Sequence, residues 1–372
     1  MKIFYITSVL GDSGGSEIYA RDLLLELQRR GHELCVYSTE RYELKGVKMV
    51  FAPSAGHHAF RKFFGVLSYF KALKAAQEFK PDLVQSHSNS MMGLIGHFLK
   101  RKLKVPHVML VELISSRNLN IHTKTIFELE KFFLPKLNYD KIVVWTENMK
   151  KNFLLKWNVP AKKIVVQPAA IELRNYAMSA NGASVKKKYG EHLITSIKTL
   201  WGTNAEGLKY VIEAMKYVKE KHPEYKYVIF GDGNYRKMLE EFAIEKGVSD
   251  VVKFAGAITP EQAREVWAAT EIAPHSFVYE FSTSVSLLEY MAAGKACVVT
   301  DIGSVQEFVG NAALVVKPND AKAMAAGINK LIEDKKKRTE LGAKARKLVE
   351  ERYSIKATVD RLEQIYSELK KR

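Results

Sequence analysis

The sequence predicts an α/β protein built from two doubly wound parallel sheets, each in its own domain. Three observations lead to this prediction. Strand-like and helix-like segments alternate along the chain in two successive sets. A polar stretch with small residues, Arg174–Gly190, separates the two sets. The chain of 372 residues is also longer than one hydrophobic core comfortably supports.

The first set opens with a strand and an amphipathic helix. Lys2–Thr7 is almost wholly apolar, and Ser16–Gly31 carries its apolar residues on one helical face before it ends on a glycine. Continuous apolar runs are typical of parallel strands that are covered on both faces. Such runs predict further strands at Glu33–Thr39, Pro81–His87, Pro106–Glu112, Lys141–Glu147 and Lys163–Ala169.

The second set repeats the alternation. Strand-like runs occur at His192–Leu200, Tyr225–Gly233, Asp250–Gly256, Glu271–Ser276, Lys295–Asp301 and Ala312–Pro318. Helical runs lie between them, and the charged segment Asp320–Arg372 is expected to form helices packed on the outside. We therefore expect domains at 1–175 and 191–355, a linker at 176–190 and a C-terminal helix at 356–372.

The composition restricts the partners and the environment. The net charge is +17, and most of the excess falls within residues 1–180. This surplus indicates attraction to nucleic acid, anionic lipid or a phosphorylated substrate, although a lysine-rich surface kept for solubility is an alternative. No apolar run has the roughly 18 residues of a membrane-spanning helix, and the first residues lack a cleavage-site pattern. Cys35 and Cys297 lie in apolar strands, which indicates buried thiols in a reducing compartment.

Three loops after strands are candidates for ligand binding, since ligands in such folds bind where strand carboxyl ends meet helix N-termini. Gly11–Glu17 and Phe230–Met238 are glycine-rich turns that open helices, and Lys198 stands at a strand end where it could neutralise a phosphate. Ordinary glycine turns and a surface lysine are the alternatives. The first turn is not Gly-x-Gly-x-x-Gly, so a nicotinamide fingerprint is absent.

The segment Phe277–Gly303 places hydroxyl groups and two carboxylates between a strand and a helix. A helix that begins near Ser284–Ser286 would hold Glu289 in its first or second turn. There a carboxylate could receive ligand hydroxyls, and the preceding Ser/Thr groups and amides could receive phosphate oxygens. The alternative is a glutamate of the capping-box kind that only steadies the start of the helix.

The order of these pieces resembles the family-4 retaining glycosyltransferases. The resemblance covers essentially the whole chain and is carried by runs such as "GGSEIYARDLLLELQRRGHELCVYS", "PDLVQSHS", "YVIFGDGNYRKMLEEFA" and "SLLEYMAAGKACVVTDIGSVQEFV". It implies the GT-B architecture, in which two Rossmann-like domains face a cleft and the C-terminal helices return toward the N-terminal domain. It also implies that the nucleotide sugar binds mainly in the C-terminal domain and the acceptor in the N-terminal one.

The resemblance assigns a part to individual residues. Lys198 stands where the family usually has an arginine on the donor diphosphate, and Glu289 matches the glutamate that usually holds the ribose hydroxyls. His87 matches a histidine often found after a strand of the N-terminal domain. The remaining matches are the front loop at Gly14 and Gly15, which closes over phosphates, and the turn near the nucleotide at Gly231, Asp232 and Gly233.

The chain departs from the family pattern at four places. The family's first glutamate, eight positions before Glu289, would fall on Phe281, so that Glu280 is one residue out of register. The usual Lys-Gly pair that opens the next helix reads Glu206-Gly207. Glu112 stands where many members have a histidine, and the usual Asn-Gly-(Val/Ile)-Asp reads Ala169–Glu172.

The resemblance implies a retaining transfer in which the protein stabilises charge on a departing nucleoside diphosphate. The available donors are Lys198 and the amides near Gly14, Gly15, Ser282 and Thr283. Glu280, Glu112 and His87 are candidates for contacts to the sugar or the acceptor. There is no Asp-x-Asp motif and no histidine at zinc spacing, so we expect no obligatory metal and no cofactor beyond a UDP- or GDP-linked sugar as co-substrate.

A basic, aromatic segment in the first half suggests a membrane surface. His57–Lys80 interleaves phenylalanines with lysine and arginine, and His97–Lys104 adds a second basic cluster. One interpretation is peripheral contact with an anionic bilayer and a lipid or lipid-linked acceptor. The other is a helix whose phenylalanines fill the core.

The resulting functional prediction is a cytoplasmic glycosyltransferase, at the membrane face if the basic segment binds lipid, with a lipid, lipid-linked or glycan acceptor. An epimerase or phosphorylase with the same fold is the alternative, as is a homologue with weakened catalysis that binds sugar or lipid. Nucleic-acid binding is not expected, because the basic residues form no groove-reading motif.

Overall fold

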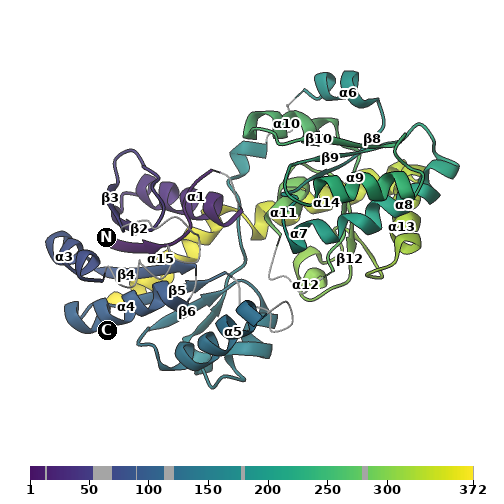
Figure 1. Ribbon diagram of the computed structural model, residues 1–372. Helices are drawn as coiled ribbons and strands as arrows, with labels where there is room; N and C mark the ends of the chain where they lie inside the picture. Colours follow the sequence, from purple (N-terminus) through teal and green to yellow (C-terminus); the bar gives the residue numbers. More distant parts are fainter. Residues whose placement is uncertain are drawn as a thin grey trace. The chain divides into compact units, whose positions relative to one another are not determined.

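In the computed structural model, the structure describes residues 1–12, 15–52, 69–88, 90–112, 121–176, 181–278 and 284–371. Two compact units divide the chain. Unit 1 comprises Met1–Ile171 together with Ile355–Arg372, and unit 2 comprises Glu172–Ser354. Both chain ends therefore belong to unit 1 (Figure 1). The segment that the sequence predicts as a linker contains the short helix α6 (Ala183–Tyr189), which belongs to unit 2.

Unit 1 is built on a seven-stranded sheet in the order β3-β2-β1-β4-β5-β6-β7, and all its neighbouring strands are parallel. Its strands are β1 (Lys2–Thr7), β2 (Glu33–Ser38), β3 (Lys48–Phe51), β4 (Leu83–Ser88), β5 (His107–Val111), β6 (Lys141–Val144) and β7 (Ile164–Val166). Its helices are α1 (Gly15–Arg29), α3 (Tyr69–Phe79), α4 (Ser90–Leu103), α5 (Ile121–Phe133), η1 (Leu134–Lys136), η2 (Met149–Leu154), η3 (Ala161–Lys163) and α15 (Ile355–Lys370).

The alternation of side chains along β1 explains how both faces of this sheet are covered. Phe4 and Ile6 pack into an apolar cluster with alanines of α3 and with Met92 and Ile95 of α4. Tyr5 points to the opposite face, where the α15 residue Tyr366 donates a hydrogen bond to Gln85 of β4. The last helix thus completes unit 1.

Several contacts hold α15 in unit 1. The Gln167 side-chain amide donates to the Thr358 carbonyl at 3.0 Å, and the guanidinium of Arg30, one residue beyond α1, donates to Glu363 at 2.7 Å. The expected return of the C-terminal helix toward the first domain is confirmed.

Unit 2 is built on a six-stranded sheet in the order β10-β9-β8-β11-β12-β13, again with parallel neighbours. Its strands are β8 (Leu193–Ile197), β9 (Lys226–Phe230), β10 (Val252–Gly256), β11 (Ile272–His275), β12 (Ala296–Thr300) and β13 (Leu314–Val316). Its helices are η4 (Leu173–Tyr176), α6, α7 (Thr203–Glu206), α8 (Leu208–Lys221), α9 (Arg236–Glu245), α10 (Pro260–Ala269), α11 (Val285–Ala292), α12 (Val305–Val309), α13 (Ala321–Glu333) and α14 (Lys335–Arg352).

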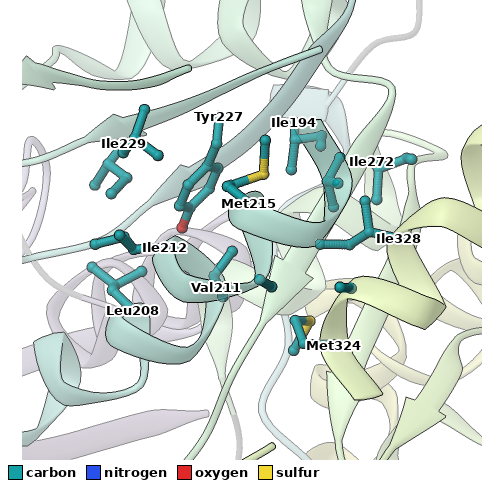
Figure 2. Packing of buried hydrophobic residues seen from close by; sticks show 14 of the residues in the cluster. Ile194, Leu208, Val211, Ile212, Met215, Tyr227, Ile229, Ile272, Met324 and Ile328 are labelled. Carbon is teal, nitrogen blue, oxygen red and sulfur yellow. The ribbon is translucent and has the colours of Figure 1, made fainter. Parts of the chain in front are cut away.

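The core of unit 2 lies between its sheet and the helices α8 and α13. Ile194, Tyr227 and Ile272 project from the sheet toward Met215 of α8 and Ile328 of α13 (Figure 2). Full burial of one such aliphatic side chain stabilises the fold by about 1.5–3 kcal/mol. The predicted class, two parallel-sheet domains of the doubly wound type, is confirmed.

The structure also bears on the predictions made for the two cysteines and for membrane-spanning helices. Cys35 and Cys297 are buried free thiols, as expected from their positions in apolar strands. Among the helices that the structure describes, none is both long and apolar enough to cross a membrane.

Candidate functional site

Lys198 lies at the carboxyl edge of the unit 2 sheet, one residue beyond β8. Its backbone N–H donates to the Phe230 carbonyl at 2.8 Å, which joins the ends of β8 and β9. Its ammonium lies 5.1 Å from the centre of the Phe277 ring. Within the described ranges no carboxylate pairs with it. Burial lowers the pKa of Lys198 to about 8, so the group is still largely a cation at neutral pH.

His275 and Ser276, at the end of β11, line the same edge. Both are buried, and the described residues offer no hydrogen-bond partner to His275 Nδ1 or Ser276 Oγ. Burial, reinforced by the positive charge of Lys198, lowers the pKa of His275 to about 3. The imidazole is therefore neutral, and Lys198 is the cation of this pair.

Glu289 lies in the second turn of α11 and takes no part in capping it. Ser284 is the N-cap, and its hydroxyl accepts from the Leu287 N–H at 3.3 Å. Glu289 Oε1 instead accepts a hydrogen bond from the Tyr176 hydroxyl at 3.0 Å. Burial raises the pKa of Glu289 to about 7, and the Tyr176 bond opposes that rise. The carboxyl group is thus poised between two protonation states near neutral pH.

The Gly231-Asp232-Gly233 turn is explained by contact with the loop after β8. Gly231 and Gly233 have φ values of 140° and 156°, and a Cβ on Gly231 would lie 1.8 Å from the Lys198 carbonyl oxygen. The two loops are joined by a hydrogen bond from the Leu200 N–H to the Asp232 carbonyl at 3.0 Å. The glycines allow this backbone approach, which holds the Lys198 loop in place.

The departure at Glu206-Gly207 also lies beside this edge. Glu206 ends α7, and Gly207 packs so closely that an added Cβ would lie 1.9 Å from the Ser276 carbonyl oxygen. The glycine is therefore required by the approach of this segment to the end of β11.

In unit 1 the structure brings His87 and Glu112 together. His87 is fully buried at the end of β4, and its Nε2 bonds Glu112 Oε1 just beyond β5. Its Nδ1 shares a hydrogen bond of 2.6 Å with the Tyr5 hydroxyl. The Tyr19 ring packs edge-on against His87, with 5.6 Å between ring centres. With Nε2–H donating to Glu112, Nδ1 accepts from Tyr5, so both ring nitrogens are satisfied.

The remaining candidates divide into two groups. Gly15 begins α1, and Ala169, Ala170 and Ile171 are buried at the end of unit 1. Gly14, Glu280, Phe281, Ser282 and Thr283 lie outside the described residues, as does His57–Ser68 of the basic, aromatic segment.

Three neighbours of the candidate residues were missed by sequence reasoning. Tyr5 lies inside a strand and His275 at the end of one, both in runs that the sequence marks only as buried, and Tyr176 lies in the expected linker. The polar residues at the ends of otherwise apolar strands are the one signal that could have pointed to His275. No comparable signal marks Tyr176, since its partner Glu289 lies 113 positions away.

Comparison with known proteins identifies the family. The family model for "Glycosyltransferase Family 4" matches residues 13–175, and that for "Glycosyl transferases group 1" matches residues 182–348. An uncharacterized glycosyltransferase of Methanocaldococcus jannaschii is 25% identical and covers 92% of this chain and 91% of its own length. The alpha-monoglucosyldiacylglycerol synthase of Streptococcus pneumoniae is 24% identical over 74% of this chain and 65% of its own.

Solved structures show the same fold. The Anabaena protein HepE, solved in complex with UDP-glucose, superposes with a TM-score of 0.81 at 17% identity, covering 99% of this chain and 100% of its own. The two-domain parallel-sheet architecture is therefore that of the GT-B proteins. With both halves matched by glycosyltransferase models, the chain belongs to the group 1 glycosyltransferases of the GT-B type.

Proposed function

We propose that this protein transfers a sugar from a nucleoside-diphosphate sugar to a hydroxyl acceptor, with retention of anomeric configuration. One observation carries the donor part of the proposal. Lys198 presents a cation with no carboxylate partner among the described residues, at the sheet edge where α/β proteins bind ligands. The UDP-glucose complex of HepE, a protein of the same fold, supports this donor class.

In the proposed reaction the bond between the anomeric carbon and the leaving phosphate oxygen breaks. A bond from the acceptor oxygen to the same face of the anomeric carbon forms, and the acceptor proton passes to the departing phosphate. Lys198 stabilises the charge that develops on the diphosphate. The Ser276 hydroxyl, which has no hydrogen-bond partner among the described residues, is a further donor at the same sheet edge. The amides near Ser282 and Thr283 are proposed as further donors to the diphosphate, and those near Gly14 and Gly15 in unit 1 are proposed to bind phosphate.

The carboxylates are proposed to hold hydroxyl groups. Glu289 receives the ribose hydroxyls, because its carboxyl, in the second turn of α11, already accepts a hydrogen bond from the Tyr176 hydroxyl and has further acceptor positions. Glu280 contacts the transferred sugar. In unit 1, Glu112 contacts the sugar or the acceptor, and His87 orients it through the hydrogen bond that they share.

We further propose a lipid or lipid-linked acceptor, reached at an anionic membrane surface. The α3–α4 surface, defined by Phe70, Lys71, Lys74, Phe98 and Arg101, carries exposed aromatic and basic side chains. Phe70 is 77% exposed and Phe98 43%, and the Tyr69 ring contacts both. Aromatic rings with flanking cations suit the interface of an anionic bilayer. The S. pneumoniae relative, named as an alpha-monoglucosyldiacylglycerol synthase, supports this acceptor class.

The donor is tested by thermal unfolding with UDP-, GDP- and ADP-sugars. A ligand present at about 100 times its dissociation constant stabilises the folded state by roughly 2.7 kcal/mol, so a bound donor raises the melting temperature. Product analysis by NMR then establishes release of the nucleoside diphosphate and the anomeric configuration of the product. If no nucleotide sugar shifts the melt, the proposed donor class is wrong. If the products are an epimerised or phosphorolysed sugar and no sugar is transferred, the protein is instead an epimerase or a phosphorylase.

A further inference from the structure

Trp201 differs from the other tryptophans of the chain. Its side chain is 60% exposed, whereas Trp145, Trp157 and Trp267 are 5%, 7% and 6% exposed. No hydrogen bond or ring contact within the described residues occupies its indole. A single exposed aromatic residue is not unusual in itself, so a functional role for Trp201 has to be argued from its position.

The backbone that leads into Trp201 is held by hydrogen bonds to neighbouring segments. Leu200, the preceding residue, is fully buried, and its N–H and carbonyl bond the Asp232 carbonyl and the Tyr235 N–H, each at 3.0 Å. Three residues before Trp201, the Lys198 N–H is bonded to the end of β9. The exposed indole is therefore carried by a loop that two neighbouring strand ends fix in place.

The indole lies directly against the Gly231–Gly233 turn. A Cβ built on Gly233 would lie 2.7 Å from Trp201 Cδ1, so the absence of a side chain at Gly233 leaves room for the ring. The Gly231 N–H in turn donates to the Gly256 carbonyl at 2.7 Å, which ties in the end of β10. Trp201 thus lies on the same sheet edge as Lys198, on the side toward β9 and β10.

We propose that Trp201 is the stacking platform for the nucleobase of the donor. An exposed planar ring three residues from the lysine proposed to bind the diphosphate offers a base its π face, and base–aromatic stacking tolerates any base. This inference rests on the proposed nucleoside-diphosphate donor and assigns the residue that recognises its base. Trp201 acts as a binding residue, separate from the charge contacts at Lys198.

The test is calorimetric titration of UDP, GDP and ADP, with inorganic pyrophosphate as the probe that lacks a base. W201A is expected to weaken each nucleoside diphosphate roughly 5- to 150-fold, the range typical for loss of one stacked base, and to leave pyrophosphate binding unchanged. W201F keeps a ring and retains most of the affinity. I244A removes another exposed apolar side chain of unit 2, 67% exposed on α9, and serves as the matched control with unchanged binding.

Tryptophan fluorescence gives a second readout that needs no disruptive variant. Because Trp201 is the exposed indole, a stacked base quenches the wild-type emission, and W201F loses this quenching while it still binds. Binding of nucleoside diphosphates by W201A with wild-type affinity, or binding to the wild type without quenching, overturns the stacking inference and leaves the donor class standing. If the wild-type protein binds none of the three nucleotides, both proposals fall.

Discussion

The Tyr176 hydroxyl, in the segment where the chain enters unit 2, donates a hydrogen bond to Glu289 Oε1 at 3.0 Å. The bond stabilises the ionised form of a carboxyl group whose pKa burial has raised to about 7. The folded protein therefore holds this proton up to about pH 7, whereas an unfolded glutamate releases it near pH 4.5. Between these values the folded state binds more protons, so the stability contributed by this group falls as pH rises.

Replacing Glu289 by glutamine is expected to raise the stability of the protein at alkaline pH and to weaken donor binding. The glutamine amide keeps an acceptor for Tyr176 but carries no charge, so E289Q should be more stable than the wild type at pH 8 by about 2–3 kcal/mol and equally stable near pH 4.5. The same variant should bind the donor more weakly if Glu289 holds the ribose. Urea unfolding at both pH values measures the first effect. An equal change in stability at pH 4.5 and pH 8 would contradict the assignment.

Lys198 is expected to produce an alkaline limit in activity. Its pKa is lowered to about 8, so the cation is lost as pH rises through 8, and kcat/KM for the donor should fall there. K198R retains its charge at any accessible pH and should remove this limit. K198M should lower kcat roughly 10²- to 10³-fold at neutral pH, the effect typical of losing one charge-stabilising donor. If the fall in kcat/KM above pH 8 persists unchanged in K198R, a group other than Lys198 causes it.

The His87–Glu112 pair predicts different effects for two substitutions of one residue. E112A leaves His87 Nε2 buried without its partner, so it should destabilise the protein by about 1–3 kcal/mol. E112Q retains a hydrogen-bond acceptor and should unfold close to the wild-type urea concentration. If Glu112 contacts the reacting sugar, E112Q still lowers kcat. If E112Q has the wild-type kcat, Glu112 only stabilises unit 1 and does not contact the reacting sugar.

The α3–α4 surface is tested by co-sedimentation with vesicles. Binding to phosphatidylglycerol vesicles at low salt is expected to weaken at least tenfold in K71E/K74E, since each basic residue near an anionic surface contributes about 1 kcal/mol. F70A/F98A should weaken binding at low and high salt alike, because the rings act through burial in the interface. Lys344 and Lys347, exposed on α14 of unit 2, supply the charge-matched control K344E/K347E. Absence of wild-type binding to anionic vesicles would remove the proposed membrane contact.

The fold was predictable because apolar runs separated by helices repeat along the whole chain. The exceptions have physical reasons. Strand β3 lies at the sheet edge, where Lys48 is exposed and Met49–Phe51 are only partly buried, and its apolar run is too short to identify a strand by itself. Helix α6 buries only Val185, which leaves no apolar periodicity to detect in the expected linker.

The sequence predicts individual residues of the candidate site but not the hydrogen bonds that join them to their partners. Lys198 and Glu289 follow from the order of strands and helices, because strand ends meet at one edge of a parallel sheet. The hydrogen-bond partners of the buried site residues Glu289 and His87 do not follow from the order of elements. Tyr5 lies 82 positions from His87, and pairs at such separations depend on which sheet neighbours the folded chain brings together.

The position of α15 has a consequence for synthesis on the ribosome. Gln85 and Gln167 lie buried in the part of unit 1 that precedes unit 2, yet the groups that they bond, on Tyr366 and Thr358, are made only after unit 2. At about 5–20 residues per second, translation of the roughly 180 residues of unit 2 separates the two halves of unit 1 by about 10–40 s. During this interval the nascent first domain lacks α15. A message truncated before residue 355 yields a protein in which Gln85 and Gln167 both lack these partners.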